Sequence, residues 1–253
     1  MSRTAVFQAL VLRCRSSGES NSEVTLLTAE EGIIKATVFG GAKSKLRAHS
    51  APYNSGQVWI YRDKAKEQAH NYSSAKLSDF DVKLWRPGLR ELYERTMTAS
   101  AIAETILSSH GGGGEWGYAL TLAAETLDTL EHANEELCAH LLIHFLWRWA
   151  RFLGIQPHLD YCSHCSKEIN DDPLFFNAGE SAASCASCAQ EFKNNGFIKL
   201  NAGCRKWLSA VEKIGSSQLQ RYSMDNQSHN EAKAFVTAVL SGVFGKRLAS
   251  WDW

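Results

Sequence analysis

Four cysteines in two Cys-x-x-Cys pairs place the strongest constraint on how this chain can fold. The pairs are Cys162 with Cys165 and Cys185 with Cys188, and 19 residues separate them. This spacing is typical of a four-cysteine zinc site, because a two-residue gap lets a tight turn direct both thiolates at one ion. A short hairpin between the pairs would bring the second turn to the same ion. Four thiolates complete a tetrahedral shell, so we expect one structural Zn²⁺ rather than a catalytic one.

Two disulfide bonds, or four unrelated thiols, would also account for these cysteines. A polar start, S-R-T, follows Met1 in place of an apolar leader. Seven cysteines without a leader indicate a reducing compartment, in which paired cysteines bind metals more often than they form disulfides. We therefore expect zinc ligands in a cytoplasmic protein. His164 is an alternative ligand inside the first pair, although four thiols are available without it.

The charge of the chain is balanced in total but unevenly distributed. The 27 Lys and Arg side chains equal the 27 Asp and Glu side chains. Residues 1–80 hold 11 basic against 7 acidic side chains, a net charge of +4, whereas residues 81–253 hold 16 against 20, a net charge of −4. We expect any contact with a polyanion to lie in the first third. A chance fluctuation is the alternative, because the excess is modest.

Apolar and β-branched runs in the first third predict five short strands, which are typical of a small barrel or sandwich. The expected strands are residues 4–14, 23–28, 33–39, 58–61 and about 69–82. After Pro87 and Gly88, apolar residues recur at three- and four-residue steps, which predicts helices. The expected helices are residues 89–109, 116–130, 134–153, 203–214 and 228–250. Histidines and arginines interrupt the most apolar segment, 137–153, so we expect no membrane span.

A basic segment, A-K-S-K-L-R-A-H-S at residues 42–50, follows the third expected strand. We interpret it as a loop in which basic side chains alternate along a turn. On a small barrel these cations and those of the neighbouring strands could line one groove and follow a phosphate backbone. The set consists of Arg13, Arg15, Lys35, Lys43, Lys45 and Arg47. A solvated loop is the alternative, and for each of the nearby aromatic residues a place in the core is favoured over base stacking: Tyr53, Trp59, Tyr61 and Tyr72.

No pattern in the sequence predicts a catalytic site. The four glycines at 111–114 have no preceding strand and no following Lys-Ser/Thr, so they lack the parts of a phosphate-binding loop. His140 and His144 share one helix face, but H-L-L-I-H lacks the glutamate of a zinc protease. We interpret the two histidines as part of a polar or half-buried helix side, and we expect the chain not to be an enzyme.

The segments taken together resemble the RecO family of bacterial recombination mediators, in the same order and over most of the chain. The resemblance is carried by A-V-F-Q-A-L-V-L-R (5–13), L-L-T-A-E-E-G-I-I-K-A-T-V-F-G-G-A-K-S-K-L-R (26–47), F-L-G-I-Q-P-H-L-D-Y-C-S-H-C (152–165) and C-A-S-C (185–188). The region 53–78 departs from the family pattern. The far C-terminus is weakly patterned in the family, so no partner-binding residue is assigned there.

The resemblance implies an α+β chain with a five-stranded OB-type β-barrel at residues 1–82. An α-helical domain at 83–253 would follow and carry the zinc module at about 160–192. It implies binding of single- and double-stranded DNA, annealing of complementary strands, and partnership with RecR and single-strand-binding protein. The outcome would be loading of RecA onto protein-coated single strands in gap repair, near the nucleoid. On the matching positions, the DNA contacts would be Lys35, Lys43, Lys45 and Arg47.

Two other classes of function stay open from the sequence. In a protein–protein scaffold, the zinc module and a helix face would recruit partners, and DNA binding would be incidental. A metal-dependent hydrolase would need an open position on the metal, which four thiolates do not leave. A DNA-binding mediator without enzymatic activity is the leading hypothesis, because the basic first third and the ordered motifs agree.

Overall fold

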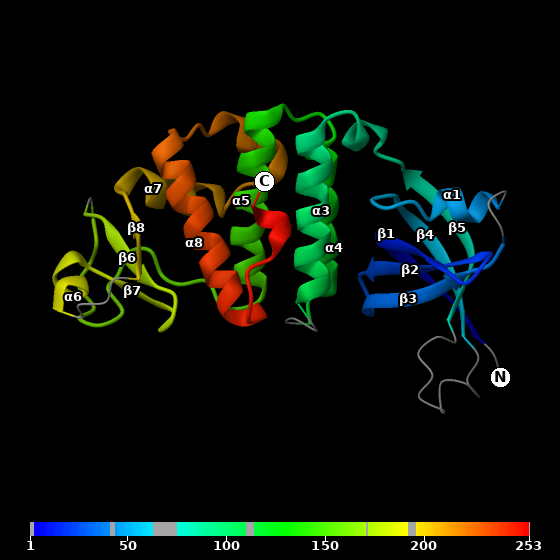
Figure 1. Ribbon diagram of the computed structural model, residues 1–253, viewed down its shortest axis with the longest axis horizontal. Helices are drawn as coiled ribbons and strands as arrows, with labels where there is room; N and C mark the ends of the chain where they lie inside the picture. Colours follow the sequence, from blue (N-terminus) through cyan, green and yellow to red (C-terminus); the bar gives the residue numbers. More distant parts are fainter. Residues whose placement is uncertain are drawn as a thin grey trace. The chain divides into compact units, whose positions relative to one another are not determined.

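The computed structural model describes residues 3–40, 44–62, 75–109, 114–170, 172–191 and 196–252. The chain divides into two compact units, each with its own core. Unit 1 comprises Met1–Leu92 and His110–Glu131, and unit 2 comprises Tyr93–Ser109 and His132–Trp253. Figure 1 labels the elements of both units along the chain.

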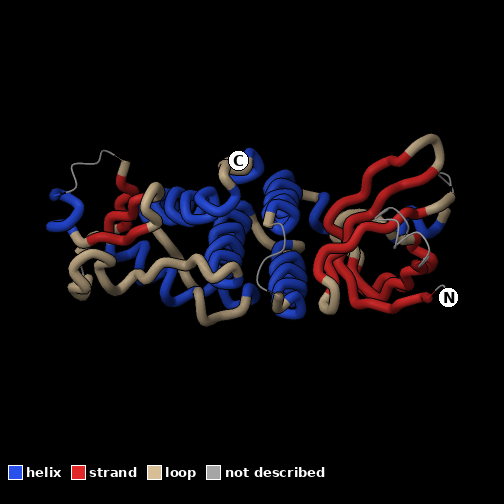
Figure 2. The backbone as a smooth tube through the Cα atoms, turned by 90° about the horizontal axis from the view of Figure 1, so that it is seen from below, coloured by secondary structure: helices blue, strands red, loops and turns tan. Residues whose placement is uncertain are grey.

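Unit 1 is built on a closed barrel of five strands in the order β1-β2-β3-β5-β4 (Figures 1 and 2). The strands are β1 (Arg3–Ser17), β2 (Asn21–Thr28), β3 (Gly32–Val38), β4 (Ser55–Arg62) and β5 (Lys76–Leu84). β4 pairs with β1 to close the barrel, and β3 and β5 form the parallel pair. The five-stranded barrel predicted from the sequence is confirmed, and its strand count is that of an OB fold.

Alternate residues of the barrel strands point inward and form its core, as the period of two in a strand requires. On β3 the inward residues are Ile34, Ala36 and Val38, and Val24 and Leu26 join them from β2. The residues between them, such as Lys35 on β3, point outward. This alternation decides which polar side chains can meet a ligand on the outside of the barrel.

The segment between β3 and β4 contains a short helix, α1 (Lys45–His49), where the sequence pattern predicted a loop. The prediction was wrong because tertiary contacts stabilise a turn of helix that is too short for a periodic pattern. The ring nitrogen Nδ1 of His49 lies 2.9 Å from the carbonyl oxygen of Phe80 on β5, and Ser50 ends the helix with its N–H bonded to Leu46.

The long helix α4 (Trp116–Leu130) belongs to unit 1 and packs on β1 and β2. Leu10 on β1 and Leu27 on β2 are register partners, and both are fully buried although neither belongs to the core cluster inside the barrel. They are buried because α4 covers them. The sequence boundary after residue 82 places this helix in the helical domain instead. The structure differs because the outer faces of β1 and β2 are apolar there and need a cover.

Unit 2 is organised around the central helix α5 (Glu135–Phe152), on which α3 (Tyr93–Ser108) and α8 (Asn226–Phe244) pack. Asn134 caps α5 by accepting a hydrogen bond from the N–H of Leu137. The other helical segments are α7 (Ala202–Val211), η3 (Ser216–Arg221), η4 (Ala249–Trp251) and α6 (Ala186–Glu191). No described helix is long and apolar enough to cross a membrane.

A three-stranded sheet interrupts the helices of unit 2, in the order β7-β6-β8. Its strands are β6 (Leu174–Asn177), β7 (Ala182–Ser184) and β8 (Phe197–Leu200). The sheet lies within the segment between the end of α5 and the start of α7, which holds both cysteine pairs. It supplies the short hairpin that the cysteine spacing requires.

Candidate metal centre and nucleic-acid interface

The four cysteines of the two pairs converge on one point in unit 2. The sulfur atoms of Cys162, Cys165, Cys185 and Cys188 all lie within 4.8 Å of one another, and those of Cys165 and Cys185 are 3.8 Å apart. Four sulfurs at the usual zinc–sulfur distance from a tetrahedral ion are about 3.8 Å apart, so the cluster fits such an ion. All seven cysteines of the chain are free thiols, which disagrees with the two-disulfide alternative.

Backbone hydrogen bonds hold the two cysteine turns next to each other. In the first turn, the N–H of Ser166 donates to the carbonyl of Cys162 at 2.9 Å. The N–H of Ser163 donates to the carbonyl of Ala183 on β7 at 2.7 Å, which joins the first turn to the hairpin. In the second turn, the N–H of Ala189 donates to the carbonyl of Cys185 at the start of α6.

The electrostatics of the cluster require a cation if all four sulfurs are thiolates. Burial raises the pKa of the Cys162 thiol, but backbone N–H groups, chiefly those of Cys165 and Cys185, outweigh it and lower the pKa to about 6. Contact with the neighbouring sulfurs, that of Cys165 first, raises the pKa of Cys188 to about 12. His164 does not belong to the cluster, so the sulfurs supply every candidate ligand.

A buried arginine ties the cysteine-bearing segment to the helices. Arg205 on α7 is 4% exposed, and its Nη1 donates to the carbonyls of Leu159 at 2.9 Å and Ile169 at 2.7 Å. Its Nη2 donates to the carbonyl of Asn170. These three carbonyls flank the first cysteine pair in sequence, so one side chain fixes both ends of the first turn.

The predicted cations Arg13, Arg15 and Lys35 lie on the outer face of the barrel. Arg13 on β1 pairs with Thr25 on β2, which pairs in turn with Lys35 on β3. Residues directly opposite in an antiparallel sheet point to the same face. Arg13, Thr25 and Lys35 therefore form one row of outward side chains that crosses three strands. Two strand spacings separate Arg13 from Lys35, about 10 Å. Arg15, two residues along β1, points to the same side and is exposed.

A second row lies beside the first and adds a cation that the sequence patterns did not single out. Arg15 pairs with Glu23, Glu23 with Thr37, and Thr37 with Lys76 at the start of β5. Lys76 is exposed. It stands 41 residues after Lys35 in the sequence, so only the parallel pairing of β3 with β5 could identify it. We call Arg13, Arg15, Lys35 and Lys76 the cationic face; Glu23 is the acidic side chain within it.

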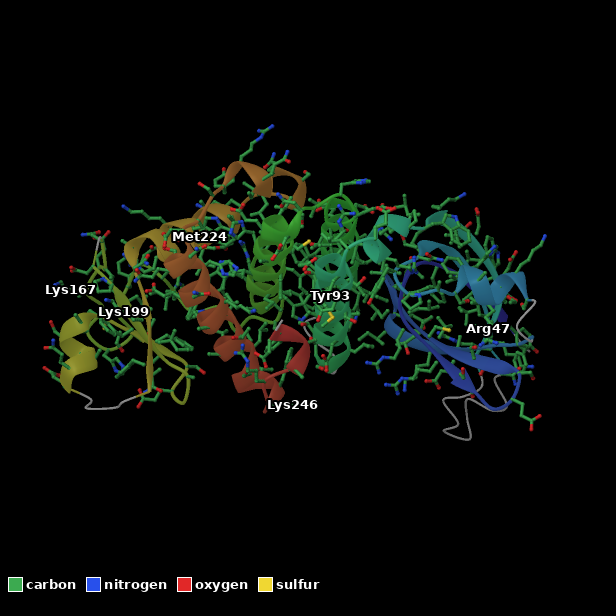
Figure 3. All side chains as sticks on the ribbon, turned by 45° about the horizontal axis from the view of Figure 1, so that its top comes forward. Arg47, Tyr93, Lys167, Lys199, Met224 and Lys246 are labelled. Carbon is green, nitrogen blue, oxygen red and sulfur yellow. The ribbon has the colours of Figure 1, made fainter. Side chains whose placement is uncertain are left out.

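The remaining predicted cations fall on a different element or outside the described residues. Lys45 is exposed and Arg47 is half-buried, and both lie on α1, where Figure 3 labels Arg47. Lys43 and Tyr72 lie outside the described residues. Of the candidate stacking residues, Trp59 and Tyr61 are half-buried on β4, with Val58 and Ile60 taking the core positions between and beside them.

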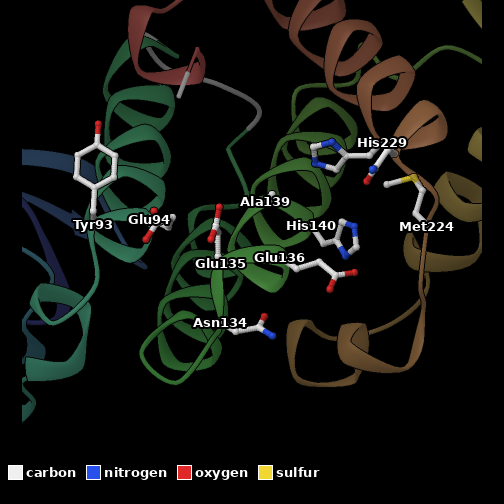
Figure 4. Close-up of a pocket in the computed structure, with 10 residues that line it drawn as sticks. Tyr93, Glu94, Asn134, Glu135, Glu136, Ala139, His140, Met224 and His229 are labelled. Atoms are coloured by element: carbon white, nitrogen blue, oxygen red, sulfur yellow. The ribbon is translucent and has the colours of Figure 1, made fainter.

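A cavity of about 750 Å³ in unit 2 lies beside the first turns of α3, α5 and α8 (Figure 4). Three carboxylates line it, those of Glu94, Glu135 and Glu136, together with the imidazoles of His140 and His229. Burial lowers the pKa of both histidines, which favours their neutral forms. No Lys or Arg is among the described residues that line this cavity. Its charge repels a phosphate backbone, so we place no nucleic-acid contact there.

The comparison with known proteins agrees with this arrangement. The family model described as recombination protein O, N-terminal, matches residues 1–80, and the corresponding C-terminal model matches residues 90–252. A DNA repair protein RecO from Pelotomaculum thermopropionicum is 30% identical over 247 residues, which cover 96% of this chain and 90% of the relative. RecO from Anaeromyxobacter dehalogenans is 28% identical over 251 residues, covering 97% of this chain and 94% of the relative.

A more distant relative, DNA repair protein RecO from an Exiguobacterium species, is 26% identical over 242 residues. That match covers 94% of this chain and 90% of the relative. The two family models leave only the short segment 81–89 between them, so nearly all of the chain is accounted for by one family. The chain belongs to the RecO family of DNA repair proteins.

Proposed function

We propose that this chain is a recombination mediator that binds DNA and anneals complementary strands. In gap repair it would help to load RecA onto single-stranded DNA coated with single-strand-binding protein. The observation that carries the proposal is the cationic face, which gathers four basic side chains from β1, β3 and β5 on the outside of an OB-type barrel. The outer face of β2 and β3 is where OB folds bind oligonucleotides.

The partners follow from the family and from the charge of the face. Cations that contact phosphates serve single and double strands alike, so both are proposed ligands. We propose RecR and single-strand-binding protein as protein partners, and a location in the cytoplasm at the nucleoid. The mediator needs no bond-making step, so we propose that it acts without enzymatic activity. Residues 1–82 would supply the DNA-binding domain, on which α4 packs, and the rest of residues 83–253 the helical domain.

The four cysteines would hold one structural Zn²⁺. Bound by four thiolates, the ion has no open coordination position, so it would stabilise the fold of the segment at about 160–192 and take no part in DNA binding. Cys162, Cys165, Cys185 and Cys188 would be its ligands, and Arg205 would keep the first turn attached to α7.

The decisive experiment measures annealing of complementary strands coated with single-strand-binding protein. The test variant combines Arg13→Ala, Arg15→Ala and Lys35→Ala. We expect it to lose most of the annealing rate and to bind single strands with a weaker salt dependence. The slope of log K against log salt should fall by about 2, since each lost phosphate contact on a single strand removes about 0.7.

A matched control removes the same number of charges from unit 2, by Lys167→Ala, Lys199→Ala and Lys246→Ala (Figure 3). We expect its salt slope for naked single strands to equal that of the wild type. If the two triple variants behaved alike, the cationic face would not be the DNA site. If the barrel variant annealed strands as well as the wild type and still captured partners after nuclease treatment, the chain would be a scaffold instead.

A further inference from the structure

The outer face of β3 continues past Lys35 to an exposed aromatic ring. Lys35 and Thr37 occupy successive outward positions of β3, and Phe39, one residue beyond the end of the strand, has 48% of its surface exposed. The residues between them, Ala36 and Val38, are in the barrel core. Phe39 is thus a phenyl ring that the fold leaves in water on the same side as the cationic face.

Lys76 connects this ring to a second one. It pairs with Thr37 on one side and with Tyr61 on the other, so the three strands β3, β5 and β4 share this row. Its ammonium nitrogen lies 5.1 Å from the centre of the Phe39 ring and 6.0 Å from the centre of the Tyr61 ring. A cation within about 6 Å of a ring face is attracted to it, so Lys76 connects the two rings across β3, β5 and β4.

The two rings extend the cationic face rather than standing apart from it. The row that begins at Arg15 passes through Glu23 and Thr37 and ends at Lys76 and Tyr61. Single exposed apolar residues are common on protein surfaces and need no explanation. Here two aromatic rings flank Lys76, which shares a row with Arg15 and lies beside the row of Arg13 and Lys35. Cations next to exposed rings are the composition of a surface that binds backbone phosphates and unpaired bases together.

We infer that Phe39 and Tyr61 form a base-stacking site that makes the barrel prefer single-stranded over double-stranded DNA. The inference rests on the proposed function and deepens it, because it adds a contact that phosphate binding alone does not provide. In a duplex the faces of the bases are stacked on one another and are not available to a protein ring. In a single strand the base faces are available. Stacking therefore contributes to the binding of single-stranded DNA alone, whereas phosphate contacts contribute to the binding of both single- and double-stranded DNA.

The test compares a Phe39→Ala, Tyr61→Ala double variant with the wild type. Affinities for a mixed-sequence single strand and for a duplex of the same length are measured by fluorescence anisotropy over a range of salt concentrations. We expect the single-strand affinity to fall by about 10-fold or more, as the loss of one or two stacked bases predicts. The duplex affinity should stay within about twofold, and the salt slopes should not change, because no charge is removed.

Two further variants keep the test specific. Tyr61→Phe with Phe39→Trp retains both rings and should restore the single-strand preference. Tyr93→Ala removes a ring of unit 2 that is 66% exposed and should change neither affinity. Equal losses for both kinds of DNA, or an unchanged single-strand affinity, would overturn the inference.

The outcome also separates this inference from the proposed function. If the Arg13, Arg15, Lys35 variant loses both kinds of DNA while the aromatic variant keeps its preference, only the stacking site is wrong. If the wild type shows no salt-dependent binding of either DNA, the proposed function itself fails. Lys76→Gln is a further comparison variant. Because it removes a charge, it should lower the salt slope for single-stranded and for double-stranded DNA, whereas the aromatic variant should leave both slopes unchanged.

Discussion

The buried guanidinium of Arg86 donates from Nε to Oδ1 of Asp128 on α4 at 2.7 Å. Its Nη1 donates to the carbonyl of Tyr53 at 2.6 Å and to Oγ of Ser55 at 3.0 Å. Arg86 is 1% exposed and lies two residues after the end of β5. Its side chain therefore joins this end of β5 to the start of β4 and to α4. This connection holds the helix that covers β1 and β2 within unit 1.

Replacing Arg86 by Met should lower the free energy of unfolding by about 3 kcal/mol. Hydrogen bonds to charged groups are lost, among them the bond from Arg86 Nη1 to the Tyr53 carbonyl. Asp128→Asn should cost less, about 1 kcal/mol, because the carboxylate is 46% exposed and the amide still accepts from Nε. Urea unfolding followed by circular dichroism measures both. Arg90→Met is the control, since that side chain is exposed; equal midpoints for Arg86→Met and Arg90→Met would contradict the role given to Arg86.

Gly32→Ala should destabilise unit 1 more than Gly18→Ala does. Both glycines have φ of +68°, so both substitutions carry the same backbone cost of about 1 kcal/mol. A Cβ at Gly32 would lie 2.4 Å from the Trp116 ring, whereas a Cβ at Gly18 meets nothing within 4 Å. The difference in unfolding free energy between the two variants therefore measures the contact of the β2–β3 turn with α4. We expect at least 1 kcal/mol, as for overpacking; no difference would mean that Trp116 can move aside freely.

Cys162→Ser and Cys185→Ser should each lower the metal content and the stability of unit 2 more than the DNA affinity of the folded protein. A structural zinc site contributes its binding free energy to folding, and the cysteine cluster lies in unit 2 whereas the cationic face lies in unit 1. Elemental analysis of the wild type should give one zinc per chain. Cys14→Ser, a thiol outside the cluster, is the control. A folded, zinc-free variant that had selectively lost DNA binding would disprove the structural role.

The cations of residues 43–47 are a separate prediction from those of the cationic face; Lys45 and Arg47 lie on α1, and Lys43 lies outside the described residues. A Lys43→Ala, Lys45→Ala, Arg47→Ala variant should bind single strands more weakly and with a lower salt slope, by up to about 2 if all three contact phosphates. Titrations at several salt concentrations check this. If this variant bound as tightly as the wild type at every salt concentration, α1 would lie outside the DNA site and the cationic face would act without it.

Stability should fall as the pH drops from about 6.5 towards 4, with His144 contributing. Burial, then the neighbouring Arg148, lowers the pKa of His144 to about 4, whereas the unfolded chain titrates near 6.5. Between these values the unfolded state binds the proton and the folded state does not, so the stability contributed by the neutral imidazole is lost as the pH falls. The full shift corresponds to about 3 kcal/mol.

Urea midpoints of the wild type and of His144→Gln, measured from pH 7 to pH 4, isolate this contribution. The variant has no titrating group at this position, so its profile should be flatter in that window. Parallel profiles for the two proteins would show that His144 does not titrate as its burial requires.

Local patterns were enough to predict the barrel strands, the long helices and the cysteine cluster, but not the short helix α1. Apolar residues alternate along β3 and recur at three- and four-residue steps along α5. Both patterns show which side of the element is buried, and they can be recognised without knowing which other element packs against that side. The spacing of the cysteines could be interpreted for the same reason, since each Cys-x-x-Cys pair forms a local turn. The four clustered cysteines are Cys162, Cys165, Cys185 and Cys188. The end of α8 was predicted too late, at residue 250, since Gly245 at φ +66° stops the helix.

What only the tertiary structure decided depends on pairing between distant segments. Arg13 and Lys35 share a row because of the register of β1 with β2 and of β2 with β3, and Lys76 joins them through the parallel pairing of β3 with β5. The sequence by itself determined that this chain has a basic barrel, a helical remainder and four clustered thiols. A one-residue change of register would turn every outward side chain inward, so the composition of the cationic face was determined by strand pairing and not by any local pattern.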